Sequence, residues 1–261
     1  MYKDIVEMIS MFPLVDLHIH TKYSDGRNPI EDVIRQAELN RVKAIAITDH
    51  YHMIQPDDFK NYISEIRRFS NVSFYTKVFP GLEVHPTKGE IPHLEEILKM
   101  GIKILLFDAI DTDVSRLSFT SKEELCEHFA NVYRKACALP EIKIFAHPLS
   151  LGRFNHIKYF SDVPQWLLEE FIECSIKGKK YIEIMNGMAW WFPKSPINRF
   201  TREYTSFIKE ALRKGARFSM GSDTHCIQGV GNLVWSQMVL KMAGAKPEDV
   251  ISLNDLYNIQ F

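Results

Sequence analysis

Short apolar runs alternate with amphipathic segments along the chain. Seven runs have the length of strands, and they cover residues 14–18, 44–48, 77–84, 103–108, 142–146, 181–185 and 217–220. Several of them, such as AIAIT and KILLF, are apolar at consecutive positions instead of at every second position. This pattern is typical of strands buried on both faces, as in a parallel sheet covered by helices.

The segments between these runs have apolar residues at helical spacing. Residues 28–40 predict a helix with Asn28 as its N-cap and Pro29 as its first helical residue. Further helices are expected at residues 57–68, 121–138, 164–176 and 201–215, with a closing helix after Val230. Repeated strand–helix alternation predicts an α/β barrel or a doubly wound sheet. Because no linker or repeat interrupts it, we expect residues 1–261 to form one domain.

Composition and charge narrow the class of protein. The chain has 261 residues, of which 46% are hydrophobic and 25% charged, as in ordinary soluble globular proteins. The net charge of -1 gives no electrostatic case for binding nucleic acid or a membrane. The four cysteines form no CxxC pair, so we expect neither a thiolate zinc site nor a disulfide framework. The N-terminal MYKDIVEMIS lacks the apolar core of a signal peptide, and we expect a cytoplasmic protein without membrane spans.

The stretch LVDLHIHTKYSDG, residues 14–26, places two histidines at the end of a strand and an acidic turn behind them. Side chains two positions apart on a strand point the same way, so Asp16, His18 and His20 are expected to share one face. Two imidazoles that converge on one point suit a metal ion. Asp25 follows in the turn as a further candidate.

Other strand ends carry the same kinds of side chain. They are Asp49 and His50 in TDH, Glu83 in GLEV, His147 in FAHP, and Asp223 and His225 in GSDTH. The carboxyl ends of parallel barrel strands open onto one face, where active sites lie. Buried carboxylates and imidazoles are costly unless they are paired or bound to metal. The sequence therefore predicts a metal centre at this face.

The donor types indicate the kind and number of ions. His18, His20, His50, His147 and His225 supply imidazoles, and Asp25, Glu83 and Asp223 supply carboxylates. This set suits zinc, manganese or iron better than magnesium or calcium. Because eight candidates exceed what one tetrahedral ion can bind, we expect two or three divalent ions. Glu83 suits a bridging position because its carboxylate has two oxygens.

The motifs DLHIHTKYSDG, AIAITDH, GLEV, FAHP and GSDTH, in this order, resemble the PHP (polymerase and histidinol phosphatase) family. The resemblance implies a distorted seven-stranded (β/α) barrel, similar to a TIM barrel, with a trinuclear metal site that hydrolyses phosphoesters. Carried over by position, it implies three ligand sets: His18, His20, Glu83 and Asp223; Glu83 and His147; and Asp25, His50 and His225. A hydroxide bound between two ions would then attack phosphorus.

The chain departs from this family at the end of the fourth strand. Many members have a metal-ligating histidine there, whereas this chain reads KILLFDAIDTD. Asp108 or Asp111 is a possible substitute, and His93 is another if its segment reaches the rim of the barrel. Without a substitute the second ion would lack a ligand, and the site would hold two metals or prefer a different metal.

Residues near the expected mouth of the site concern the substrate. Arg153 follows the FAHP motif and is a candidate to bind phosphate through a bidentate contact, with Lys22 and Arg27 as weaker candidates. The aromatic loop after the sixth strand is expected to pack over the barrel, with contact to an organic ring or base of the substrate as the alternative. Glu183 and Asn186 are expected to support the site. No role is assigned to His52, His85, His128 and His156, which are expected to be surface or structural residues.

The leading interpretation is therefore a metal-dependent phosphatase that acts on a small phosphorylated substrate. Nucleic acid is not the expected substrate, and the sequence does not predict an oligomeric state. Two alternatives stay open, an amidohydrolase-type metal hydrolase and a metal-binding regulatory protein without turnover.

Overall fold

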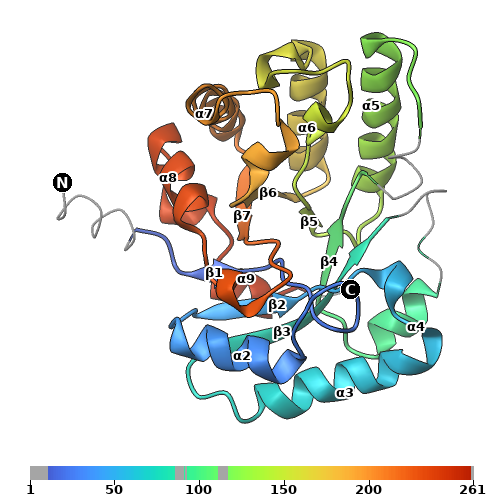
Figure 1. Ribbon diagram of the computed structural model, residues 1–261, viewed down its shortest axis with the longest axis vertical. Coiled ribbons are helices and arrows are strands. Elements are labelled where there is room, and N and C mark those ends of the chain that lie inside the picture. Colours follow the sequence, from blue (N-terminus) through green and yellow to red (C-terminus); the bar gives the residue numbers. More distant parts are fainter. Residues whose placement is uncertain (1–10, 86–90, 92, 111–116, 260–261) are drawn as a thin grey trace.

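Seven parallel strands in sequence order form the centre of the computed structural model (Figure 1). The structure describes residues 11–85, 91, 93–110 and 117–259. The strands are β1 (Val15–Asp16), β2 (Ala44–Ile47), β3 (Lys77–Val84), β4 (Ile104–Phe107), β5 (Ile144–Phe145), β6 (Tyr181–Met185) and β7 (Arg217–Gly221). Their positions agree with the seven apolar runs, although β1 and β5 are shorter than expected.

The sheet closes where β1 meets β7. The N–H of Leu17 donates to the carbonyl of Met220 at 3.1 Å, and Ile19 pairs with Thr224 in a parallel bridge. Strand and helix alternate around this ring. The fold is thus a nearly closed seven-stranded (β/α) barrel, as predicted, and the shortness of β1 and β5 distorts it.

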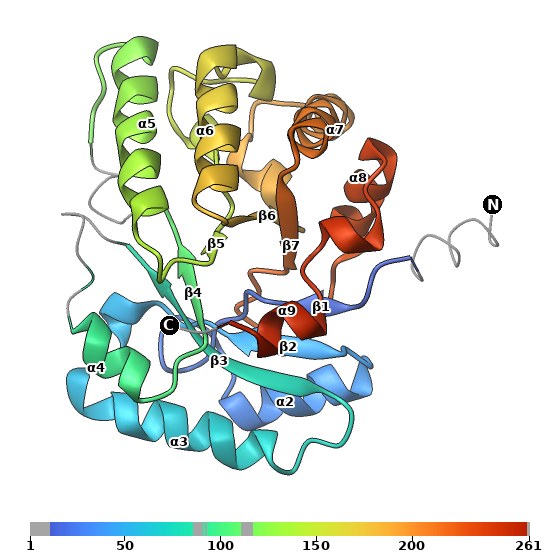
Figure 2. The same cartoon turned by 180° about the vertical axis from the view of Figure 1, so that it is seen from behind.

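Helices surround the strands (Figures 1 and 2). They are α2 (Ile30–Leu39), α3 (Phe59–Ser70), α4 (Leu94–Lys99), α5 (Lys122–Ala138), α6 (Gln165–Lys177), α7 (Ile197–Lys214), α8 (Val234–Ala243) and α9 (Leu253–Tyr257). Two expected helix starts are wrong by a few residues. Pro29, not Asn28, is the N-cap of α2, and α7 begins before residue 201. The expected end of α7 is confirmed, because Gly215 adopts a φ of 94° in the C-cap.

The buried apolar residues form two groups. The larger group lies between the strands and the surrounding helices, and includes Ile45, Leu105 and Phe218. The smaller group combines residues from β1 to β5 with Leu256 of α9 and Ile251, which precedes that helix. The helix α9 therefore packs against the apolar side chains that β1 to β5 contribute to this group.

The expectation about cysteines is wrong for one pair. Cys137 near the end of α5 and Cys174 in α6 form a disulfide, because these helices pack side by side although 37 residues separate the two cysteines. Cys126 and Cys226 are free. None of the helices in the described part of the chain has the length and apolar character needed to span a membrane.

Candidate metal centre

Glu83 lies near the end of β3, and four imidazoles face its carboxylate. Its Oε1 is 3.2 Å from Nε2 of His147 and 3.4 Å from Nε2 of His18. Its Oε2 is 2.8 Å from Nδ1 of His50 and 3.6 Å from Nε2 of His20. The Glu83 side chain is fully buried. Both oxygens of one carboxylate therefore face nitrogen donors, which is the arrangement expected of a bridging ligand.

Asp223 completes a first group around the two histidines after β1. Its Oδ1 lies 3.2 Å from Nε2 of His20 and 3.5 Å from Nε2 of His18. The backbone of Asp223 has a φ of 53°, and its N–H donates to the carbonyl of His18 at 2.9 Å. The close pairing of β1 with β7 therefore brings His18, His20 and Asp223 together.

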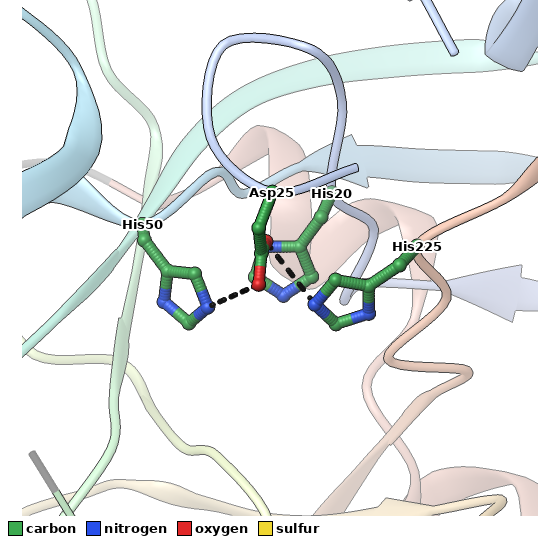
Figure 3. Close-up of side chains that lie close together, drawn as sticks. All are labelled: His20, Asp25, His50 and His225. Atoms are coloured by element: carbon green, nitrogen blue, oxygen red, sulfur yellow. Dashed lines mark ion pairs between the residues drawn. The ribbon is translucent and has the colours of Figure 1, made fainter. Parts of the chain in front are cut away.

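A second group lies toward the solvent, and Figure 3 shows Asp25 between two imidazoles. Asp25 Oδ1 is 3.2 Å from Nε2 of His225, and Asp25 Oδ2 is 3.7 Å from Nε2 of His50. His20 is the third imidazole of this group, with its Nδ1 3.8 Å from Oδ1 of Asp25. The Asp25 side chain is 41% exposed, so this group is more accessible than the one around Glu83.

The loop that carries Asp25 is held by Asp49, a buried residue next to His50. The Asp49 carboxylate accepts hydrogen bonds from the backbone N–H of Thr21 at 2.7 Å and from the hydroxyl of Ser24 at 2.6 Å. The loop then passes so close to the segment after β1 that a Cβ on Gly26 would lie 2.5 Å from the backbone of His20. Asp49, which the sequence placed among the candidates, thus supports the site through the loop.

Asp16 does not share a face with His18 and His20, so that expectation is wrong. The Asp16 carboxylate accepts the backbone N–H groups of Ser222 and Gly231, each at 2.8 Å. Regular strand β1 ends at Asp16, and the alternation of side chains is interrupted there. Both histidines still face Asp223, and Ile19 between them pairs with Thr48 after β2 and with Thr224 after β7.

Glu183 on β6 supports two of the imidazole residues. Its Oε1 is 2.9 Å from Nδ1 of His18, and its Oε2 accepts the backbone N–H of His147 at 2.6 Å. The contact with Nδ1 leaves Nε2 of His18 directed at Glu83 and Asp223. The geometry agrees with the supporting role expected of Glu183. Asn186, the other expected supporting residue, accepts the backbone N–H of Trp235 at 2.9 Å.

The charges of these groups are strongly coupled. Burial alone would raise the pKa of Glu83, but the imidazoles of His18, His147 and His50 hold it well below its usual range. Burial alone would lower the pKa of His147, but Asp108 and Glu83 raise it to about 9. Burial lowers the pKa of His20. The nearby carboxylates thus favour a proton on His147, whereas burial disfavours one on His20.

The donor atoms fit divalent metal ions. Both oxygens of Glu83, both ring nitrogens of His20 and Nε2 of His18 are buried and make no hydrogen bond within the described part of the chain. Such atoms are rare in folded proteins unless an ion or water satisfies them. Three groups offer donor atoms within 4.8 Å of one another: His18, His20 and Asp223; His18, Glu83 and His147; and His20, Asp25, His50 and His225. These residues include all eight candidates from the sequence.

The structure places two of the three residues considered as the extra ligand of the second ion, Asp108 and His93. Asp108 is buried between two imidazoles, with Oδ1 3.7 Å from Nδ1 of His147 and Oδ2 3.5 Å from Nδ1 of His85. Because Nε2 of His147 faces Glu83, Asp108 contacts the far side of that ring. The His93 side chain is 72% exposed and pairs with Glu96 on α4. Asp111 lies outside the described residues.

A pocket of about 280 Å³ opens above these groups. Its walls include Met53, Ile110, Arg153 and Trp191. The guanidinium carbon of Arg153 lies 4.2 Å from the centre of the Trp191 ring, and that ring is 5.8 Å from the His147 ring. The structure thus places Arg153 at the pocket, whereas Lys22 lines a neighbouring pocket and Arg27 lines neither.

Two pocket residues had no role assigned from the sequence. His52 and His85 both line the pocket beside His50. The available signal in the sequence was that each lies two residues after a candidate ligand, His50 or Glu83. This signal does not show whether the side chain turns toward the pocket. His156 has a structural contact, with its Nε2 2.7 Å from the carbonyl of Phe119.

Comparisons with known proteins agree with the motifs. The PHP domain family model matches residues 16–187. No curated protein matches the chain. Histidinol phosphate phosphatase from Lactococcus lactis subsp. lactis Il1403, solved with zinc, L-histidinol and phosphate, superposes with a TM-score of 0.70 at 16% identity, over 90% of this chain and 95% of that chain.

Two other solved structures are more distant. A chain of an archaeal ribonuclease P with mature tRNA gives a TM-score of 0.46 at 12% identity, over 87% of this chain and 90% of that chain. An amidohydrolase from Chromobacterium violaceum, solved with sulfate and without metal, gives a TM-score of 0.38 at 17% identity. The match covers 81% of this chain and 87% of that chain. The family match covers more than half of the residues, and with it the first four motifs around the pocket. The chain belongs to the PHP domain family.

Proposed function

We propose that this protein is a metal-dependent phosphoesterase that hydrolyses a small phosphomonoester. The observation that carries the proposal is the grouping of five imidazoles and three carboxylates, Glu83 among them, at one pocket. Membership of the PHP family supports it, as does the similar fold of a phosphatase solved with zinc and phosphate. The eight residues act as ligands within a single metallohydrolase domain.

The ligand sets proposed here are those implied by the family resemblance, and each overlaps one of the three groups of donors in space. His18, His20, Glu83 and Asp223 hold one ion, and Glu83 with His147 holds a second. Asp25, His50 and His225 hold a third, in the more exposed position. Zinc, manganese and iron suit these donors. When bound, such ions activate water as a nucleophile and neutralise charge on the phosphate oxygens.

Residues around the ligands keep them in position. Glu183 fixes the orientation of the His18 ring through Nδ1, and Asp49 holds the loop that presents Asp25. Arg153 binds phosphate oxygens through its guanidinium group, which is held against the face of Trp191. In this arrangement Arg153 contributes to substrate binding, while the ligand groups carry the chemistry.

Pocket size and lining support a small phosphorylated substrate. A volume of about 280 Å³ suits a phosphate group with a small organic part, and Met53, Ile110 and Trp191 supply apolar contacts for that part. Histidinol phosphate is one candidate, and small sugar or nucleoside phosphates are others. A net charge of -1 does not favour a long nucleic acid as substrate.

The test combines metal analysis with phosphate release. The purified protein is loaded with zinc or manganese, its metal content is measured, and phosphate release is followed from an aryl phosphate and a panel of small phosphomonoesters. Two or three ions per chain with phosphate release support the proposal. Bound metal with amide hydrolysis but no phosphate release identifies an amidohydrolase. Bound metal without any turnover supports the metal-binding regulatory protein, and absence of metal binding rejects all three.

A further inference from the structure

Three imidazoles form a group on the pocket wall beside the proposed ligand sets. His50 is the N-cap of the short helix Tyr51–Met53, His52 lies in that helix, and His85 follows β3. The ring centres are 5.4 Å apart for His50 and His52, 5.1 Å for His52 and His85, and 5.5 Å for His50 and His85. Each ring offers one nitrogen, and the three nitrogens lie within 4.8 Å of one another. We call these residues the outer imidazole group.

The two nitrogens of His50 face different partners. Nε2 lies 3.7 Å from Oδ2 of Asp25, on the side shared with His225. Nδ1 lies 3.4 Å from Nε2 of His85 and 2.8 Å from Oε2 of Glu83. His50 therefore stands between the Asp25–His225 pair and the outer imidazole group, and it can contribute to either.

His85 has a carboxylate next to one ring nitrogen, as metal-ligating histidines commonly do. Its side chain is only 6% exposed, and its Nδ1 lies 3.5 Å from Oδ2 of the buried Asp108. That Nδ1 makes no hydrogen bond within the described residues. Asp108 is itself anchored, because its Oδ1 accepts the backbone N–H of Ile110 at 2.8 Å. A carboxylate at one ring nitrogen orients the ring and leaves the other nitrogen available to an ion.

We propose that His50, His52 and His85 form a further metal site that takes a borderline divalent ion such as zinc. Three imidazoles without a carboxylate donor favour zinc, nickel or copper over magnesium, calcium or manganese. The three residues line the pocket, so an ion reaches them from solvent. A neutral imidazole has one lone pair, so His50 serves either this site or the Asp25–His225 position at one time. The two positions are alternatives for one exchangeable ion.

The test removes the alternative position and counts ions. The parent variant is Asp25→Ala/His225→Ala, whose replaced side chains are 41% and 36% exposed and contribute little to folding. Protein is dialysed against chelator-buffered zinc, and zinc per chain is measured by mass spectrometry of the elements. The parent is expected to keep the zinc content of the unmodified protein. Adding His52→Ala or His85→Gln is expected to remove one ion.

A matched control adds His93→Ala to the same parent, because His93 is 72% exposed and contacts Glu96 instead of the pocket. This control is expected to keep the parent's zinc content. The inference is overturned if the parent has already lost one ion, or if the His52 and His85 variants retain as many as the parent. If circular dichroism shows that the parent is unfolded, Asp25→Asn/His225→Gln replaces it. Zinc content is read without turnover, so this inference and the proposed function fail separately.

Discussion

Oε1 of Glu183 lies 2.9 Å from Nδ1 of His18, and both side chains are almost completely buried. The second oxygen of Glu183 accepts the backbone N–H of His147 at 2.6 Å. One carboxylate on β6 thus positions a histidine after β1 and another after β5. A carboxylate can accept at both oxygens, whereas a carboxamide has only one acceptor oxygen.

Glu183→Gln is therefore expected to weaken metal binding without removing a ligand. Either the contact with Nδ1 of His18 or the hydrogen bond from the N–H of His147 then meets an amide NH₂ group instead of an oxygen. If the contact with His18 is the one lost, the ring loses its fixed orientation. Loss of such a partner typically lowers metal affinity by about 10- to 100-fold. Competition with a chromophoric chelator measures the affinity. Unchanged affinity in a folded variant would show that Glu183 does not position His18.

Much of the fold could be predicted because its signals are local. Buried strands are continuous apolar runs, and polar residues at their ends stand out against them, as Glu83 does after GL in GLEV. Parallel packing then brings such ends to one face. The candidate residues could therefore be placed at one face from the motifs, whereas their division into ligand sets came from the family resemblance. Their roles as ligands stay a prediction.

Other features depended on tertiary packing that has no local signal. The interruption of β1 after Asp16 turns that carboxylate toward the backbone of Ser222 and Gly231. The disulfide of Cys137 and Cys174 requires α5 and α6 to be neighbours. His85 directly follows β3 and lines the pocket beside His50, a position that no local pattern in the sequence indicates.

Asp223→Asn is expected to remove metal-dependent turnover while the barrel stays folded. The amide keeps the size of the side chain, and asparagine tolerates the φ of 53° at this position better than alanine does. What it loses is the negative charge that faces His18 and His20. We expect kcat/KM to fall by about 1,000-fold or more, since the metal supplies most of the rate. Full activity in this variant would mean that Asp223 is not a ligand.

Metal binding is expected to release protons and to strengthen as pH rises. In the metal-free protein, burial lowers the pKa of His147 but Asp108 and Glu83 raise it, to about 9. His147 thus carries a proton below pH 9 that a metal ion must displace. Each displaced proton makes the affinity rise about tenfold per pH unit.

Titration calorimetry in buffers of different ionisation enthalpy counts these protons. The number released should be larger at pH 7 than above pH 9, and the zinc affinity should increase between the two. His147→Gln should release fewer protons at pH 7 than the unmodified protein. Equal proton release at both pH values would contradict the raised pKa of His147.

Arg153→Ala is expected to act mainly on substrate binding. The guanidinium group lies against the Trp191 ring at the pocket, and a charge-assisted contact to phosphate contributes about 1.5–3 kcal/mol. We expect KM for a phosphomonoester to rise about tenfold or more, with little change in kcat. Arg153→Lys should lie between, because lysine keeps the charge but loses the planar fork. Lys158→Ala, a control that removes another cation of the same loop, should leave KM unchanged.

The pair Arg217–Asp255 is expected to make stability depend on acid pH. It joins the start of β7 to α9, with two contacts of 2.9 Å and 3.2 Å. Burial alone would raise the pKa of Asp255, but hydrogen bonds from Arg217 and Ser252 lower it to about 2, against 3.8 for the free group. The unfolded chain thus binds more protons between these values, so the pair's contribution is complete above pH 3.8 and is lost as pH falls through about 2.

Asp255→Asn should therefore lower the free energy of unfolding at pH 7 by about 1 kcal/mol, a modest value because the pair is partly exposed. Urea unfolding of the metal-free protein measures this difference. Metal-free samples are used so that loss of metal ions from the candidate ligands does not change the free energy of unfolding as pH falls. The difference between the two proteins should shrink as pH falls from 3.8 toward 2, because protonation of Asp255 removes the same charge that the substitution removes. A difference that stays constant over this range would show that the charge of Asp255 does not stabilise the contact between α9 and the barrel.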